Sequence, residues 1–144
     1  MILTDWDGLL AGTDDYQVRP AATEEDLARH AERLHVIFPP QLRKLYLVSD
    51  GVFDQHGQWF VVWPLSDLPG RNEPEWTAGG AGRRELLAFG DDGTGAHFCV
   101  PRDGGPGVFV WNPVAAAPFW LANDVGDFWL GWTTGEITTY ASAA

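Results

Sequence analysis

The histidine and cysteine side chains are the first candidates for chemistry in this sequence. The histidines, His30, His35, His56 and His97, lie in no recognisable motif with a serine or a cysteine, so no nucleophilic triad is predicted. Cys99 follows His97 by two residues, which would place both side chains on one face of a strand within reach of a metal ion. Structural zinc needs about four ligands, and no second Cys/His pair accompanies these two. We expect no metal site and interpret Cys99 as a small buried residue.

A glycine-rich loop, GDDGTG at residues 90–95, follows a predicted strand, as a phosphate-binding loop does. The next segment, residues 96–100, is predicted to be another strand, so no helix N-terminus is available to hold a phosphate. The carboxylates of the loop also lack the spacing of a calcium-binding helix-loop-helix. We interpret the loop as a tight turn whose Asp91 and Asp92 bond their own backbone, and the same two carboxylates are candidates for exposed contacts. No cofactor is predicted.

Pairs of carboxylates offer a third kind of chemistry, acid–base catalysis on a sugar. Asp50 with Asp54, and Glu73 with Glu75, are close in the sequence, but nothing in their spacing places two carboxyl groups across a cleft. Solvated surface charge is the simpler interpretation of all of them. We therefore predict that the protein is not an enzyme.

The charge balance points to the kind of partner. Twenty acidic and nine basic residues in a chain of 144 give a formal net charge of −11. A nucleic acid partner is not expected, because phosphate binding needs local Lys or Arg side chains. A strongly basic protein is the complementary partner, although a purely solubilising role for the charge is an equally good interpretation.

The sequence also predicts a compartment. With one cysteine, Cys99, the chain cannot form an internal disulfide, so a reducing environment suits it. No apolar run is long enough to span a bilayer, and the N-terminus does not resemble a secretory signal. We expect a cytoplasmic protein that makes no contact with a membrane.

Helical signals lie at both ends of the chain. Thr23 is followed by three acidic residues, which favours a helix capped by its hydroxyl. A pair of prolines ends that helix and opens the next one, which stops near Gly51. A short helix is predicted within residues 1–12, and a last helix is capped by Asn123 or Asp124.

The middle of the chain has the periodicity of strands. Gly/Asp-rich turns between the later strands favour an antiparallel meander, whereas the stretch from Leu65 to Arg84 is left without an assignment. This order predicts an α+β fold, in which N-terminal helices and a C-terminal helix pack on a small, mainly antiparallel β-sheet in one domain, residues 1–144. The predicted strands are residues 59–63, 86–89, 96–100 and 107–111.

Aromatic residues are numerous, with eight Trp, eight Phe and three Tyr. Most of them must lie in the core, and any that are exposed together would suit an interface or a sugar platform. Trp59, Trp76 and Trp120 are the candidate stacking residues. A small-ligand or glycan-binding domain is therefore the alternative function.

The order of short motifs along the chain resembles a known family. A capped helix leads to Phe38-Pro39-Pro40-Gln41-Leu42, and the next helix carries Leu45-Tyr46 and ends at Asp50-Gly51. The later steps are Trp63-Pro64-Leu65, Phe89-Gly90-Asp91 through Gly95, Val108 to Trp111 and Asp127-Phe128. Together they resemble the SUKH superfamily, which includes fungal cell-wall assembly regulators and many bacterial immunity proteins. The family usually has Leu-Pro where this chain has Phe38-Pro39, and Asn-Gly where it has Asp50-Gly51.

This resemblance implies a protein-binding domain without catalytic activity. Bacterial members are implied to neutralise toxins, often nucleases, that competing cells deliver. An acidic surface would speed association with a basic toxin, and a few aromatic or arginine anchors would supply most of the affinity. The residues expected to touch the partner are carboxylates at the ends of predicted elements and one indole: Asp50, Asp54, Asp91, Asp92 and Trp59.

Overall fold

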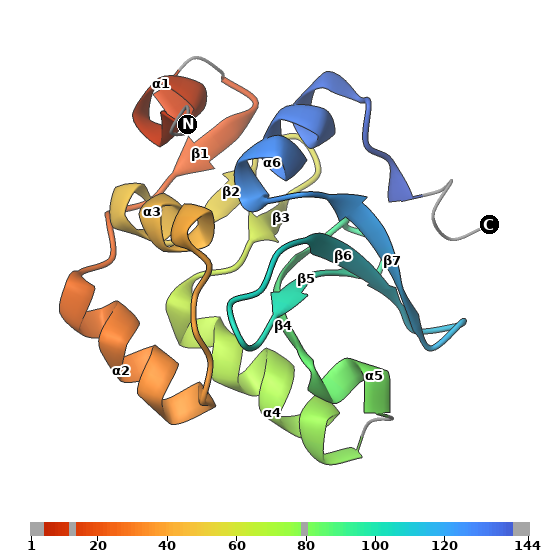
Figure 1. Ribbon diagram of the computed structural model, residues 1–144. Coiled ribbons are helices and arrows are strands. Elements are labelled where there is room, and N and C mark those ends of the chain that lie inside the picture. Colours follow the sequence, from red (N-terminus) through yellow and green to blue (C-terminus); the bar gives the residue numbers. More distant parts are fainter. Residues whose placement is uncertain (1–4, 12–13, 79–80, 140–144) are drawn as a thin grey trace.

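The computed structural model describes residues 5–11, 14–78 and 81–139 (Figure 1). Within these ranges the chain forms six α-helices and two antiparallel sheets, which confirms the predicted α+β class. None of the helices in the described ranges is long and apolar enough to cross a membrane. The helices are α1 (Trp6–Ala11), α2 (Glu24–Leu34), α3 (Pro40–Val48), α4 (Leu68–Ala78), α5 (Ala81–Arg84) and α6 (Val125–Thr134), and a 3₁₀ turn, η1 (Leu65–Asp67), precedes α4.

The helix ends follow from local chemistry. At the start of α2 the hydroxyl of Thr23 accepts a 3.0 Å hydrogen bond from the Asp26 N–H, as predicted. Of the two cap candidates for α6 the structure uses Asp124, whose carboxylate accepts a 2.8 Å hydrogen bond from the Asp127 N–H. Gly135 ends α6 with a φ of 81°, a left-handed conformation that glycine adopts without steric cost.

The expected single sheet is divided into two. The three-stranded sheet has the order β1 (Tyr16–Val18), β2 (Val52–Asp54), β3 (Trp59–Val62), and the four-stranded sheet has the order β4 (Leu86–Asp91), β5 (His97–Pro101), β6 (Val108–Asn112), β7 (Ala117–Ala122). The two sheets meet where the Trp63 N–H donates a 2.8 Å hydrogen bond to the Phe89 carbonyl. This contact places β3 beside β4 and joins the two sheets.

Aromatic side chains fill the space between the four-stranded sheet and α6. The rings of Phe98 and Phe128 lie 4.6 Å apart, and Phe89 contacts Phe128 edge-on at 6.0 Å. Helix α3 is tied to the same core because the buried Tyr46 hydroxyl donates a 2.8 Å hydrogen bond to the Trp63 carbonyl. This core fixes the position of the hairpin ends described below.

The stretch left without an assignment contains η1, α4 and α5, held to β4 by buried polar groups. The Asn72 amide donates to the carbonyls of Leu68 and Ala88 and accepts from the Ala88 N–H. Its oxygen also accepts a 3.1 Å hydrogen bond from the guanidinium of Arg83, which is 1% exposed. Glycine and proline within α4 weaken its helical signal, so these tertiary contacts, and not local propensity, stabilise it.

Candidate protein-binding surface

The β2–β3 hairpin brings two of the predicted contact residues together. Asp54 and Trp59 are paired across the two strands. The Asp54 carboxylate accepts hydrogen bonds of 2.8 Å from the N–H groups of His56 and Gly57, so it closes the turn between the strands. Asp54 remains partly exposed at the end of the hairpin.

Trp59 joins this hairpin to the glycine-rich loop. Its indole N–H donates a 3.0 Å hydrogen bond to the Asp91 carbonyl, and its ring lies against Gly93, where an added Cβ would come within 3.1 Å of it. The carboxylate of Asp91 accepts a 2.9 Å hydrogen bond from the indole of Trp63 and a 2.7 Å one from the Gly93 N–H. Asp91 is partly exposed, so its charge is fixed in place while it still faces solvent.

Asp15 extends the same surface from the first strand. Its carbonyl accepts a 3.0 Å hydrogen bond from the Gln55 N–H, and its exposed carboxylate lies 2.8 Å from the imidazole of His56. Burial raises the pKa of the Tyr16 hydroxyl, and the negative charges of Asp54 and Asp15 raise it further. We call Asp15, Asp54, Trp59 and Asp91 the acidic surface.

Asp92 differs from the exposed contact that the sequence predicted, because its side chain is turned inward and the residue is 8% exposed. One carboxylate oxygen accepts from the N–H and hydroxyl of Thr94 and from the Ala96 N–H, and the other accepts a 2.6 Å hydrogen bond from the Thr139 hydroxyl. Burial by itself would raise the pKa of Asp92, but these hydrogen bonds outweigh it and the pKa lies below its ordinary value. Asp92 therefore holds the loop in shape.

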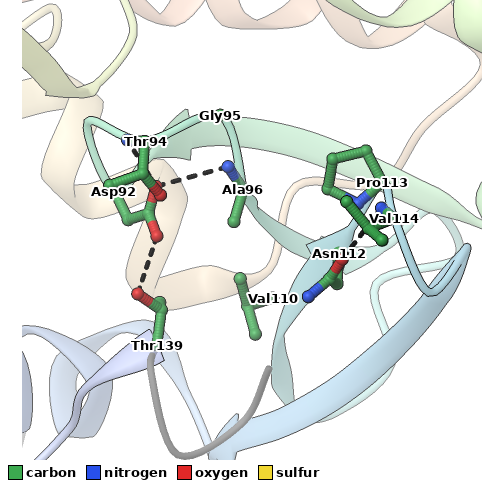
Figure 2. A pocket seen from close by; sticks show the side chains of 9 residues that line it. All are labelled: Asp92, Thr94, Gly95, Ala96, Val110, Asn112, Pro113, Val114 and Thr139. Carbon is green, nitrogen blue, oxygen red and sulfur yellow. Dashed lines mark hydrogen bonds between the residues drawn. The ribbon is translucent and has the colours of Figure 1, made fainter. Parts of the chain in front are cut away.

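Figure 2 shows the pocket beside this carboxylate. It has a volume of about 190 Å³ and lies between the 92–96 turn, the tip of the β6–β7 hairpin and Thr139. A second pocket of about 280 Å³ lies between Trp59, Trp132 and the same threonine. Among the described residues that line either pocket, Asp92 is the one acidic or basic residue. Its carboxylate already accepts four hydrogen bonds from the protein.

Asp50 lies apart from the acidic surface. It precedes β2, at the end of the strand opposite Asp54, and its carboxylate accepts a 2.8 Å hydrogen bond from the Leu65 N–H. This bond holds the start of the η1 turn. Four of the five predicted residues therefore come together around the glycine-rich loop. Asp54, Trp59 and Asp91 belong to the acidic surface, and Asp92 lies inside the loop. Asp50, the fifth, lies elsewhere.

The His97–Cys99 pair has a structural environment. The ring of His97 packs edge-on against Trp63 at 5.0 Å, and burial, with the nearby Arg83 charge, lowers the pKa of His97. Cys99 is buried, which raises the pKa of its thiol to about 12, so the thiol stays protonated at neutral pH. Within the described ranges no three His, Cys, Asp or Glu side chains gather closely enough to hold a metal ion.

The three candidate stacking indoles do not form one platform. The Arg102 guanidinium lies 3.7 Å over the ring of Trp76, and Trp59 packs on Gly93. Trp120 is 53% exposed, on strand β7. The geometry therefore gives little support to a sugar site that uses all three.

The basic residues are placed unevenly over the elements of the fold. All nine Lys and Arg residues lie between Arg19 and Arg102, and none falls in α1, β1, β2, β3 or α6. In Figure 1 these five elements lie in the upper part together with α3, which carries Arg43 and Lys44, whereas α2, α4 and α5 form the lower part. Three arginines pair with carboxylates of α2 and α4: Arg29 with Asp26, Arg33 with Glu73 and Arg43 with Glu24. The net charge alone did not reveal this uneven placement, which can be read from the positions of the basic residues in the sequence.

An α+β domain of this kind, with a fixed acidic surface, has the features of a binding module. The family model of the SMI1 / KNR4 family (SUKH-1) matches residues 21–131, well over half of the chain. The chain belongs to this family, and the resemblance inferred from the order of its motifs is confirmed. No curated protein matches the sequence significantly.

Proposed function

We propose that the protein is a non-catalytic immunity-type protein that binds and neutralises a basic toxin domain, with a nuclease as the expected class of toxin. The acidic surface is the proposed docking site. Action in the cytoplasm, where an incoming toxin would meet its target, is part of the proposal. Membership of the SMI1 / KNR4 family supports a domain of immunity or regulator type.

The observation that carries the proposal is the excess of negative charge around the acidic surface. The acidic surface and the segments beside it contribute Asp5, Asp7, Asp14, Asp15 and Asp54. Two guanidinium groups lie near them, Arg19 over the Phe60 ring and Arg71 over the Trp63 ring, so negative charge is in excess there. A field of one sign on one side of a protein steers an oppositely charged partner and raises its association rate by about 10- to 1,000-fold.

The hydrogen bonds of the acidic surface give a second line of support. Asp54 and Asp91 are held by N–H donors from their own turns, so their carboxylates are ordered before a partner arrives. A pre-ordered surface loses less conformational entropy on binding than flexible side chains do. Trp59 is partly exposed between these carboxylates and offers an aromatic anchor at their centre.

Co-expression with the protein encoded beside this gene tests the proposal. If a toxin domain is encoded there, we expect the two chains to co-purify at physiological salt and the toxin to lose its activity in the complex. The interaction should weaken as the salt concentration rises, because exposed charge pairs are screened. A neighbouring toxin that fails to bind at both low and physiological salt would overturn the proposal.

A further inference from the structure

The pocket of about 280 Å³ beside Trp59 is lined by parts of the chain that lie far apart in the sequence. Trp59 comes from β3, Asp92 from the 92–96 turn, Trp132 from α6 and Thr138 from the segment after α6. We call this cavity the indole pocket. Pockets that hold whole small molecules begin at about 300 Å³, so the indole pocket suits a single side chain better than a cofactor.

Both indoles of the pocket are held in place. Trp59 donates a 3.0 Å hydrogen bond to the Asp91 carbonyl, and the ring of Trp132 lies 5.1 Å from Phe98 and stacks on Phe128 at 6.4 Å. Both indoles are nevertheless partly exposed. Because the rings are ordered before a ligand arrives, binding costs little conformational entropy.

Asp92 adds a negative charge to the wall of the indole pocket. Three neutral residues, Thr94, Ala96 and Thr139, donate the four hydrogen bonds that its carboxylate accepts, and they keep its pKa below the ordinary value. None of the ion pairs in the described part of the chain involves Asp92. A buried negative charge without a cation is costly, and a bound cation relieves that cost.

Two indoles and a carboxylate together select a cation that can stack on a ring. The face of an indole carries negative charge and attracts cations, and a guanidinium suits it well because it is planar and weakly hydrated. The chain uses this contact elsewhere: Arg102 lies 3.7 Å over Trp76 and Arg71 lies 4.7 Å over Trp63. Among the described side chains no such cation lies over either indole of the pocket.

We propose that the indole pocket binds the guanidinium group of an arginine side chain, and that the basic toxin presents this arginine. The choice of occupant rests on the proposed function, and Trp59 links the two because it belongs to both the acidic surface and the pocket. The exposed carboxylates would then set the rate of encounter, and the inserted arginine would supply much of the affinity.

An NMR titration of the isotope-labelled chain with N-acetylarginine amide tests the site without any toxin. The chain has eight indole N–H signals, and Trp59→Phe and Trp132→Phe identify the two that matter. We expect these two signals to shift together with a millimolar dissociation constant. The citrulline analogue has the same shape without the charge and should bind at least about tenfold more weakly. No shift at either indole, or equal binding of the two ligands, overturns the proposal.

A substitution at the rim of the pocket locates the site. Thr138 is exposed and lines the pocket, so Thr138→Trp fills the space while the hydrogen bonds of Asp92 stay in place, and the arginine titration should lose its shifts. The matched control is Thr77→Trp, at an exposed position on α4. If Thr77→Trp reduces arginine binding as much as Thr138→Trp does, the indole pocket is not the site.

The same two variants test the occupant. Thr138→Trp should raise the dissociation constant of the toxin complex by at least about tenfold, and Thr77→Trp should leave it within about twofold. Equal binding of the toxin to both variants would overturn the arginine anchor and leave the proposed function standing. Absence of toxin binding to the unsubstituted chain would instead overturn the proposed function, whereas the arginine titration would still decide whether the pocket is a guanidinium site.

Discussion

The hydroxyl of Thr139 donates a 2.6 Å hydrogen bond to the carboxylate of Asp92, which joins residues 47 positions apart in the sequence. This bond fastens the segment after α6 to the turn between β4 and β5 (Figure 2). The Ile137 N–H donates to the Gly131 carbonyl and supports the same segment from the helix side. The wall between the two pockets near the acidic surface therefore depends on Asp92.

Replacing Asp92 should destabilise the fold and loosen this segment. Asp92→Ala removes four hydrogen bonds and leaves the Thr94 and Ala96 N–H groups unpaired, so we expect the free energy of unfolding to fall by about 1–3 kcal/mol. Thr139→Val removes one of the four and should cost less, about 0.5–1.5 kcal/mol. Urea unfolding followed by Trp fluorescence measures both.

The exposed Glu136 supplies the control for this pair. Glu136→Gln should change the free energy of unfolding by less than about 0.5 kcal/mol, as surface substitutions usually do. If Asp92→Ala proves as mild as Glu136→Gln, Asp92 does not hold the loop.

Acidification should weaken the fold in two separate pH ranges. The pKa of His97 is lowered in the folded protein, so the unfolded chain binds more protons and stability falls as the pH drops below about 6.5 toward the folded pKa. The pKa of Asp92 is also lowered, so its contribution is present above about pH 4 and is lost as the pH falls through its folded pKa.

Unfolding free energies measured between pH 7 and pH 5 isolate the histidine. We expect the pH dependence of His97→Gln to be flatter than that of the unsubstituted chain in this range, since glutamine does not titrate. His35→Gln, at an exposed position, is the matched control and should leave the slope close to that of the unsubstituted chain. Equal slopes for the unsubstituted chain and His97→Gln would show that His97 does not cause the loss of stability between pH 7 and pH 5.

Asn72 should be among the most sensitive positions of the fold. Its amide makes four buried hydrogen bonds that join α4, β4 and the Arg83 guanidinium. Asn72→Ala leaves these buried groups without a hydrogen-bond partner. We therefore expect the free energy of unfolding, measured in urea, to fall by at least about 3 kcal/mol. Thr77→Ala, on the exposed side of the same helix, should cost less than about 0.5 kcal/mol. Similar losses at the two positions would show that the buried bonds contribute little.

The helix ends and strands β3 to β6 could be predicted because their signals are local. The Thr23 cap and the turns of the β4–β6 meander are encoded within a few residues, and the structure has them where the patterns indicate. Strands β1 and β2 were missed, since three-residue strands give too short a pattern. Strand β7 was missed as well, because its apolar sequence APFWLA has no alternation of polar and apolar residues. Helix α4 was missed because Asn72 stabilises it through contacts with β4, 16 residues away.

The candidate surface could be predicted in part, because some of its residues also lie in turns with local signals. The sequence pointed to Asp54, Asp91 and Trp59, and the structure brings them together through hydrogen bonds across hairpins. It could not show that Asp92 turns inward, because that depends on Thr139 from a distant segment. Asp15 had no local signal, and it joins the surface only when β1 pairs with β2.

The association rate of the toxin complex tests the central claim, that the negative charge around the acidic surface speeds docking of the toxin. Asp14→Lys with Glu136→Lys alters exposed positions beside the acidic surface, and Glu25→Lys with Glu32→Lys alters exposed positions on α2. Each acid-to-lysine change adds two units of charge, so both double variants bring the net charge from −11 to −7.

Stopped-flow mixing of each double variant with the toxin domain encoded beside this gene, at low salt, gives the decisive comparison. We expect the pair beside the acidic surface to slow association at least about tenfold and to flatten its salt dependence, and the α2 pair to have a much smaller effect. Equal slowing by the two pairs would mean that total charge, and not its placement, governs encounter, and would contradict the account.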